Sequence, residues 1–165
     1  EMALKLYATA AQWTLEASPS TFMELFSGQG AFSFFIQKHV KQAIGVEINV
    51  EAVERANLTA KNLNLKHLSF VAQDAALVEK MVLDFNPELI LVNPPRRGLA
   101  GVNQILKKVK SRYFIYSSCN AETLAQDLIQ LKDHFTVIKA QVFDMFPNTD
   151  HFETLVLLES NAYRT

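Results

Sequence analysis

The residue best suited to covalent chemistry is the single cysteine, Cys119, in the run Ser-Cys-Asn at 118–120. It follows an apolar strand predicted over 113–117 and directly precedes a helix predicted over 121–131. The partial positive charge at a helix N-terminus favours the thiolate, which is the reactive form. Inert cysteines usually lie inside strands or helices, so we predict that Cys119 is a nucleophile rather than a buried space-filler.

A carboxylate with an unusual position is Glu153, at the start of a strand near the end of the chain. Its neighbours on the same strand face are Leu155 and Leu157, because side chains alternate along a strand. The carboxylate therefore points toward the apolar side unless it lines a cleft. Burying a charge is unfavourable, so this position needs a specific reason.

A glycine turn is suited to holding a small ligand. A strand predicted over 22–26 runs into Gly28 and Gly30, and a helix follows; such a turn brings the backbone close to a ligand and exposes free N–H groups. Dinucleotide enzymes have glycine at the sixth position of this turn, where the chain has Ser33. Glu24 before the turn instead favours the glycine loop of S-adenosylmethionine (SAM)-dependent methyltransferases. A plain structural turn is the alternative.

Two further acids follow predicted strands. Glu47 lies near the end of a strand over 43–48, where a carboxylate in a doubly wound fold accepts hydrogen bonds from a ribose diol. An ordinary strand-end charge is the alternative. Asp74 leaves a strand over 68–71, and two roles are equally weighted for it: contact with an adenine amino group, or the N-cap of a helix.

The most apolar strand, predicted over 87–92, leads into Asn-Pro-Pro-Arg-Arg-Gly at 93–98. Its composition places it at the centre of the sheet. The two prolines stiffen the loop and hold Asn93 at the carboxyl end of the strand, where open sheets bind ligands. Arg96 and Arg97 pair with a phosphate or with the helix-facing surface, and a solvated turn is the alternative.

These side chains are positioned by alternating helices and strands. A leading helix over 2–16 carries Leu4, Tyr7, Ala11 and Leu15 at helical spacing, and Pro19 ends it. Further helices are predicted over 31–41 and 99–109, and a helix capped by Asn49 runs to about residue 63 with Val53, Ala56 and Ala60 on its buried side. The last two strands, over 135–146 and 151–158, are joined by a link too short for a helical crossover and must pair antiparallel. We therefore predict an α/β, Rossmann-like class I SAM-dependent methyltransferase fold: a mostly parallel seven-stranded sheet with a C-terminal antiparallel hairpin.

Composition bounds the class of protein. The 165 residues with 49% hydrophobic content fit one domain over 1–165, with 1–18 as its leading helix. One cysteine excludes an internal disulfide and a cysteine-rich metal site. No membrane-length apolar run or leader is present, which predicts a cytoplasmic protein. The net charge of −1 argues against gripping nucleic acid by bulk electrostatics. The chain begins inside a helix, so we expect a fragment of something longer.

The chain resembles the RNA uracil-C5 methyltransferases along essentially its whole length, and within that family the enzymes that act on bacterial 23S rRNA. Ser-Cys-Asn combined with a downstream His-x-Glu is specific to the group. Asn93 followed by paired arginines favours the rRNA branch, because the tRNA relative more often has Asp at that position. The motifs that carry the resemblance are Leu-Tyr-Ala-Thr-Ala at 6–10, Leu-Phe-Ser-Gly-Gln-Gly at 25–30, Val-Asn-Pro-Pro-Arg-Arg-Gly at 92–98, Tyr-Ser-Ser-Cys-Asn at 116–120, Phe-Asp-Met-Phe-Pro at 143–147 and His-Phe-Glu at 151–153.

The resemblance implies SAM contacts at Phe26, Glu47 and Asn93, with Gly28 shaping the turn. It implies 23S rRNA as substrate, and no membrane or protein partner. The family's upstream Phe-x-Gln element, which also touches the cofactor, falls before residue 1. So does the N-terminal region that carries a four-cysteine 4Fe-4S cluster in similar proteins. Part of the RNA grip is expected in that missing region.

The resemblance also gives Cys119 and Glu153 the catalytic roles. Carbon 5 of uracil is a weak nucleophile, and addition of the Cys119 thiolate at carbon 6 makes it electron-rich. After methyl transfer, Glu153 is the general base that removes the carbon 5 proton. Arg96 and Asn93 orient the ring or stabilise its enolate oxygen.

Three alternatives stay open at this point. The first is a tRNA uracil-C5 methyltransferase. The second is an amino-group methyltransferase, because Asn-Pro-Pro at 93–95 resembles the loop that holds an amide or exocyclic amine, although Arg96 replaces its aromatic residue. The third is a catalytically idle SAM-fold module that serves as an RNA-binding platform.

Overall fold

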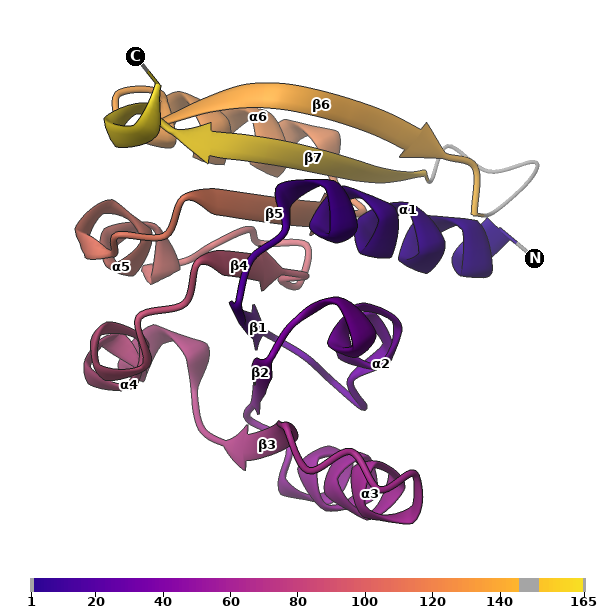
Figure 1. Ribbon diagram of the computed structural model, residues 1–165. Helices are drawn as coiled ribbons and strands as arrows, with labels where there is room; N and C mark the ends of the chain where they lie inside the picture. Colours follow the sequence, from indigo (N-terminus) through magenta and orange to yellow (C-terminus); the bar gives the residue numbers. More distant parts are fainter. Residues whose placement is uncertain (1, 146–151, 165) are drawn as a thin grey trace.

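The computed structural model describes residues 2–145 and 152–164, and within them seven strands form one sheet in the order β3-β2-β1-β4-β5-β7-β6 (Figure 1). The pairs β1·β2, β1·β4, β2·β3 and β4·β5 are parallel, whereas β7 pairs antiparallel with β5 and β6. The predicted sheet and its C-terminal antiparallel pair are therefore confirmed. The strands are β1 (Thr21–Leu25), β2 (Gln42–Glu47), β3 (Leu68–Ala72), β4 (Leu89–Val92), β5 (Tyr113–Ser118), β6 (Phe135–Phe143) and β7 (Glu153–Ser160).

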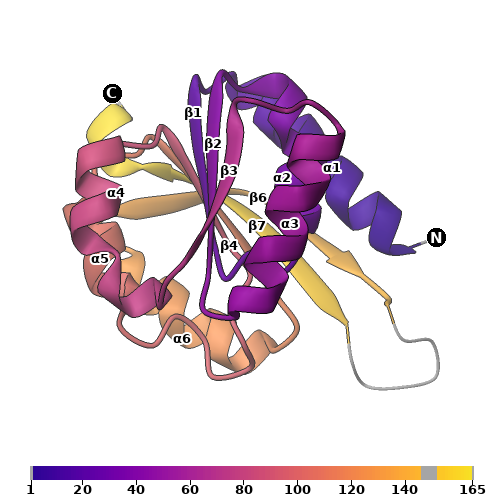
Figure 2. The same cartoon turned by 90° about the horizontal axis from the view of Figure 1, so that it is seen from below.

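Helices cover both faces of the sheet (Figure 2). One layer holds α1 (Met2–Ala17), α2 (Ala31–Ile36) and α3 (Val50–Asn62), and the other holds α4 (Glu79–Phe85), α5 (Val102–Lys108) and α6 (Ala121–Leu131). Three short 3-10 helices, at Gln37–His39, Ala75–Leu77 and Asn161–Tyr163, complete the described elements. Each layer encloses its own apolar core against the sheet.

The central position predicted for the most apolar strand is confirmed at β4. All four of its side chains are fully buried, with Leu89 and Leu91 in the core beneath α1–α3 and Ile90 and Val92 in the core beneath α4–α6. A strand that is buried on both faces has no polar side to alternate with, which explains its continuous apolar run.

The buried face predicted for the leading helix is wrong in part. Leu4 and Leu15 are more than half exposed, whereas Leu6, Ala10 and Trp13 are buried. α1 carries apolar residues on more than one stripe, so helical spacing alone did not decide which stripe faces the core. The stripe with the large Trp13 ring removes more apolar surface from water and is the one that packs.

Several element bounds also differ from the predicted ones. The helix predicted over 99–109 covers Val102–Lys108, because Gly101, with φ +99°, directly precedes it. The helix predicted over 31–41 ends at Ile36 and continues as a 3-10 turn. β6 ends at Phe143 rather than 146, and residues 146–151 lie outside the described residues.

None of the helices formed by the described residues has the length and apolar character that crossing a bilayer requires.

Candidate active site

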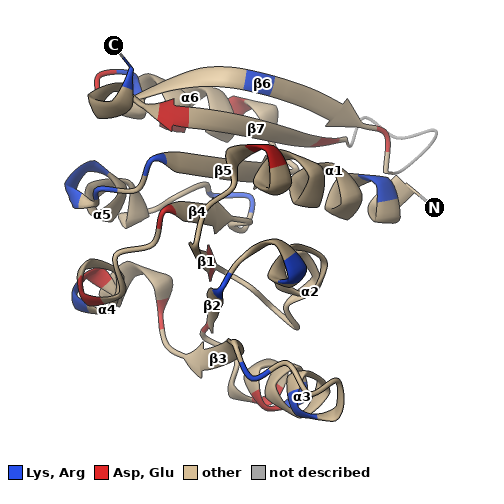
Figure 3. Ribbon diagram, viewed as in Figure 1, with Lys and Arg blue, Asp and Glu red and all other residues tan. Residues whose placement is uncertain are grey.

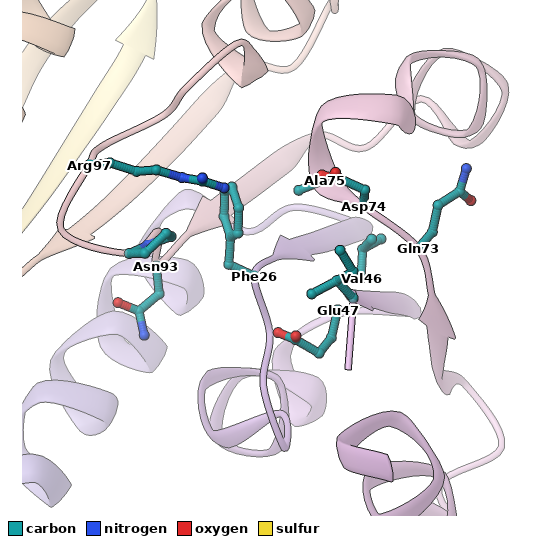
Figure 4. A pocket seen from close by; sticks show the side chains of 10 residues that line it. Phe26, Val46, Glu47, Gln73, Asp74, Ala75, Asn93 and Arg97 are labelled. Atoms are coloured by element: carbon teal, nitrogen blue, oxygen red, sulfur yellow. The ribbon is translucent and has the colours of Figure 1, made fainter. Parts of the chain in front are cut away.

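A cavity of about 310 Å³ lies where the carboxyl ends of β1, β2, β3 and β4 meet (Figure 4). Parallel strands bring their carboxyl ends to one edge of the sheet, and the side chains that follow each strand converge there. One cavity is therefore lined by four of the predicted ligand residues: Phe26, Glu47, Asp74 and Asn93. The full lining is Phe26, Val46, Glu47, Ile48, Gln73, Asp74, Ala75, Asn93, Pro95 and Arg97.

The glycine turn shapes one side of this site. Phe26 and Gly28 have φ values of +61° and +54°, and a Cβ added at Gly28 meets no atom within 4 Å. The turn therefore leaves open space beside its backbone. The Gly28 N–H donates to Oε2 of Glu47 at 2.9 Å, and the Asn49 N–H donates to Oε1 at 2.9 Å. Glu47 is thus held in a fixed orientation at the cavity wall, with lone pairs left for a ligand.

Glu24 has a structural role: it caps the helix that follows the glycine turn. It is almost fully buried, and its Oε2 accepts hydrogen bonds from the Ser33 N–H at 2.9 Å and from the Ser33 hydroxyl. Gly30, the N-cap of α2, has no side chain to cap the helix, so Glu24 supplies this acceptor from β1. Burial raises the pKa of Glu24 to about 8.

The N-cap role weighed for Asp74 is confirmed, whereas its contact with an adenine amino group stays a prediction. Its Oδ1 accepts from the Ala76 N–H at 2.9 Å, which makes it the N-cap of the 3-10 helix Ala75–Leu77. It also lines the cavity. The cap fixes the side chain, because the backbone donor is part of a regular element.

Of the two arginines after β4, Arg97 lines the cavity and Arg96 does not. Figure 4 shows Arg97 entering from the loop after β4, across from Asp74. The backbone carbonyl of Arg96 accepts from the Asn120 side-chain amide at 3.2 Å. This bond ties the arginine loop to the loop that carries Cys119.

Cys119 lies just past the end of β5 and before α6, which is the position that the sequence predicted, and it is half-buried. Asn120 is the N-cap of α6, and its side-chain oxygen accepts from the N–H groups of Glu122 at 3.0 Å and Thr123 at 3.3 Å. Cys119 is not part of the cavity lining. It therefore occupies a neighbouring position along the same edge of the sheet.

Glu153 begins β7 and is 9% exposed, on the face shared by the buried Leu155 and Leu157. Its Oε1 accepts a hydrogen bond of 2.6 Å from the Ser117 hydroxyl. Burial raises the pKa of Glu153, and the Ser117 hydrogen bond opposes that rise. Because β5 and β7 pair Ser118 with Thr154, extending this antiparallel register by one residue sets Cys119 opposite Glu153.

Asp127 on α6 is a buried residue near the site that the sequence analysis missed. Its Oδ2 accepts from the Leu99 N–H at 2.9 Å and from the Tyr116 hydroxyl at 2.7 Å. It also packs so closely on Gly98 that a Cβ there would lie 2.5 Å from Oδ2. The signal in the sequence was an acid on the stripe of α6 that also carries the buried Leu124 and Leu131.

Sheet order, helix layers and the carboxyl-edge cavity define the class I methyltransferase fold. The tRNA (uracil-5-)-methyltransferase family model matches residues 1–161. The chain therefore belongs to that family. A solved structure of Pyrococcus abyssi tRNA (uracil-54, C5)-methyltransferase in complex with S-adenosyl-L-homocysteine superposes with a TM-score of 0.76 at 27% identity, covering 91% of this chain and 38% of that one. The N-methyltransferase NodS of Bradyrhizobium japonicum shares the fold, with a TM-score of 0.80 at 15% identity over 98% of this chain and 88% of that one.

Curated relatives include 23S rRNA (uracil(747)-C(5))-methyltransferase RlmC of Vibrio vulnificus, 44% identical over 158 residues, and RlmC of Proteus mirabilis, 43% identical over 162 residues. These alignments cover 95% and 96% of this chain. They cover 42% of each relative. The chain thus spans less than half the length of the curated relatives that it matches.

Proposed function

We propose that the chain is the methyltransferase domain of a longer enzyme that methylates carbon 5 of a uridine in 23S rRNA with SAM. The family, and relatives of this name at 42–44% identity, support the reaction class. The observation that carries the catalytic part is the juxtaposition of two strand ends: Cys119 follows β5, and Glu153 begins its antiparallel partner β7.

The cavity fits SAM by the chemistry of its donors. Glu47, already oriented by two backbone N–H groups, offers acceptors to a ribose diol. Asp74 offers an acceptor to an adenine amino group, and the exposed apolar Ile48 lines the same wall. Asn93 and the open backbone at Gly28 complete the cradle. Bound there, SAM supplies an electrophilic methyl group.

The chain's own residues then carry the covalent steps. The Cys119 thiolate adds to carbon 6 of the uracil ring, and the electron pair of the 5,6 double bond moves toward carbon 5 and the carbon 4 oxygen. Carbon 5 becomes nucleophilic enough to accept the methyl group. Asn93 and Arg96, on the stiff loop after β4, are proposed to orient the ring and stabilise its enolate oxygen.

Glu153 completes the reaction as general base. Its carboxylate takes the proton from carbon 5, the C–H electron pair restores the 5,6 double bond, and the bond from carbon 6 to sulfur breaks to release Cys119 as thiolate. Burial raises the pKa of Glu153, which makes the carboxylate a stronger base than one in water.

RNA recognition is proposed to depend in part on the rest of the longer protein. Lysines and arginines are scattered over α1, α3, α5 and β6 with acids between them (Figure 3), and the net charge is −1. Phosphate neutralisation needs a basic face. We propose that an N-terminal region with a 4Fe-4S cluster supplies it, and that the protein acts on rRNA in the cytoplasm. The target uridine must leave its stack to reach Cys119.

The test uses the full-length protein, SAM and a 23S rRNA transcript made with 5-fluorouridine, which has no removable proton at carbon 5 and traps the adduct. Wild-type protein is expected to give a covalent complex on denaturing gels, and Cys119→Ala none. Glu153→Gln with ordinary RNA is expected to transfer one methyl group and accumulate the adduct. Trapping by Cys119→Ala, or normal turnover by Glu153→Gln, would remove that residue from its role.

The substrate is tested in parallel. Methylation of 23S rRNA but not of a tRNA transcript is expected, with 5-methyluridine as the product. The opposite preference would support the tRNA alternative. An amino-group methyltransferase would keep its activity in Cys119→Ala, and an idle module would fail to bind SAM.

A further inference from the structure

Ser117 is a buried hydroxyl that neither the cavity nor the proposed covalent steps use. It lies on β5, two residues before Cys119, and its side chain is fully buried. Its hydroxyl donates to Oε1 of Glu153 across the β5·β7 pair at 2.6 Å. The bond therefore joins the strand that presents the nucleophile to the residue proposed as base.

Strand register explains why the two side chains meet. Ser117 pairs with Leu155, and Glu153 precedes Leu155 by two residues, so Ser117 and Glu153 are diagonal neighbours on one face of the sheet. Such neighbours in an antiparallel pair lie close enough for a long side chain to reach across. Both strands belong to the sheet, so the contact rests on a rigid frame rather than on a loop.

We propose that Ser117 is a positioning residue for Glu153: its hydroxyl fixes Oε1 and thereby directs Oε2 to the carbon 5 proton. This inference rests on the proposed function. The proton moves from carbon 5 to Oε2, the C–H electron pair restores the ring double bond, and the Cys119 thiolate leaves. Ser117 donates to Oε1 before and after the transfer and exchanges no proton itself.

The surroundings make this donor important. Tyr7 on α1 packs against the same apolar core as Leu155 and Leu157. Burial, followed by the charges of Glu24 and Glu153, raises the pKa of Tyr7. Cys119, which directly follows β5, adds a thiol near the start of β7. Burial opposes ionisation of Glu153, whereas the Ser117 donor favours it. Removing the donor should leave Glu153 protonated at higher pH.

The experiment follows two events separately in single turnovers of the full-length protein. RNA carrying tritium at carbon 5 of uridine reports proton removal, and denaturing gels report adduct formation. Ser117→Ala is compared with Ser117→Thr, which keeps the hydroxyl. The matched control is Ser111→Ala, because Ser111 is also buried, also gives its hydroxyl to one acceptor, the Pro87 carbonyl, and lies just before the opposite end of β5.

In Ser117→Ala, adduct formation should keep its wild-type rate, and the acidic limb of the tritium-release profile should move up by about one pH unit. Below that limb, release is then about tenfold slower, as expected for one lost hydrogen bond to a charged group. Ser117→Thr should restore the wild-type limb, and Ser111→Ala should not move it. An unchanged limb in Ser117→Ala, or an equal shift in Ser111→Ala, would overturn the proposal.

Failure of the proposed function gives a different result. Wild-type protein would then form no adduct and release no tritium. The Glu153 carboxyl, followed by carbon-13 NMR and assigned with Glu153→Gln, still reports on the contact, because it should titrate at higher pH in Ser117→Ala than in wild type. Identical titrations would overturn the Ser117 assignment whatever the protein catalyses.

Discussion

Replacing the buried Glu24 by glutamine should change how stability depends on pH. Burial raises the pKa of Glu24 from 4.5 to about 8 in the folded protein. The folded state therefore holds a proton that the unfolded chain releases above pH 4.5. The stability that this proton provides is fully present below pH 4.5 and is lost as the pH rises toward 8.

The size of the effect follows from the shift. A difference of about 3.5 pH units corresponds to at most about 5 kcal/mol of unfolding free energy, which is a large share of the roughly 5–15 kcal/mol typical of a domain. Glu24→Gln does not titrate, and its amide oxygen can still accept from Ser33. The variant should therefore gain stability relative to wild type as the pH rises.

The assay is urea unfolding of both proteins, followed by circular dichroism at steps from pH 5 to pH 9. The free-energy difference between variant and wild type should grow by several kcal/mol across this range. Glu54→Gln, at an exposed position on α3, is the matched control and should give a curve parallel to wild type. If the Glu24→Gln curve also runs parallel to wild type, within about 0.5 kcal/mol, the assignment of a neutral buried Glu24 is refuted.

Three other substitutions test the site. Glu47→Ala removes the acceptor of the Gly28 N–H and should weaken S-adenosylhomocysteine binding at least about tenfold by calorimetry; unchanged affinity would exclude Glu47 from the cofactor site. Asp127→Asn disturbs two buried hydrogen bonds to one carboxylate oxygen and should lower the free energy of unfolding in urea by about 2 kcal/mol; a loss below about 0.5 kcal/mol would show that these hydrogen bonds do not stabilise the fold. Gly30→Ala places a Cβ 2.4 Å from the Phe70 ring at a φ of +82° and should lower the melting temperature by several degrees; a wild-type value would show that the turn relaxes freely.

Much of the fold was predictable because strand ends and helix starts carry local signals. Asn49 was predicted to cap α3 and does so by accepting from the Ala52 N–H. Val53, Ala56 and Ala60 were predicted on its buried side and are buried. These predictions needed only capping chemistry and one apolar stripe, both of which are local.

Parts of the site were not predictable, because they depend on contacts between distant segments. Arg96 and Arg97 are adjacent, and their types give no clue that Arg97 lines the cavity. The hydrogen bond from the Leu99 N–H to Asp127 joins α6 to a loop 28 residues away in the sequence. The partner of Glu153 was missed for the same reason: Ser117 lies 36 residues earlier and meets it only through strand register.

The proposed cofactor site and the proposed catalytic pair lie at different strands of the sheet. The cavity is built from the ends of β1 to β4, whereas Cys119 follows β5 and Glu153 begins β7. On the proposed function, donor and acceptor are therefore held by separate stretches of chain. Substitutions in β7 are then expected to change how the nucleobase is held while most of the pocket for the nucleoside of the methyl donor stays intact, and the loop after β4, with Asn93, is where the two specificities meet.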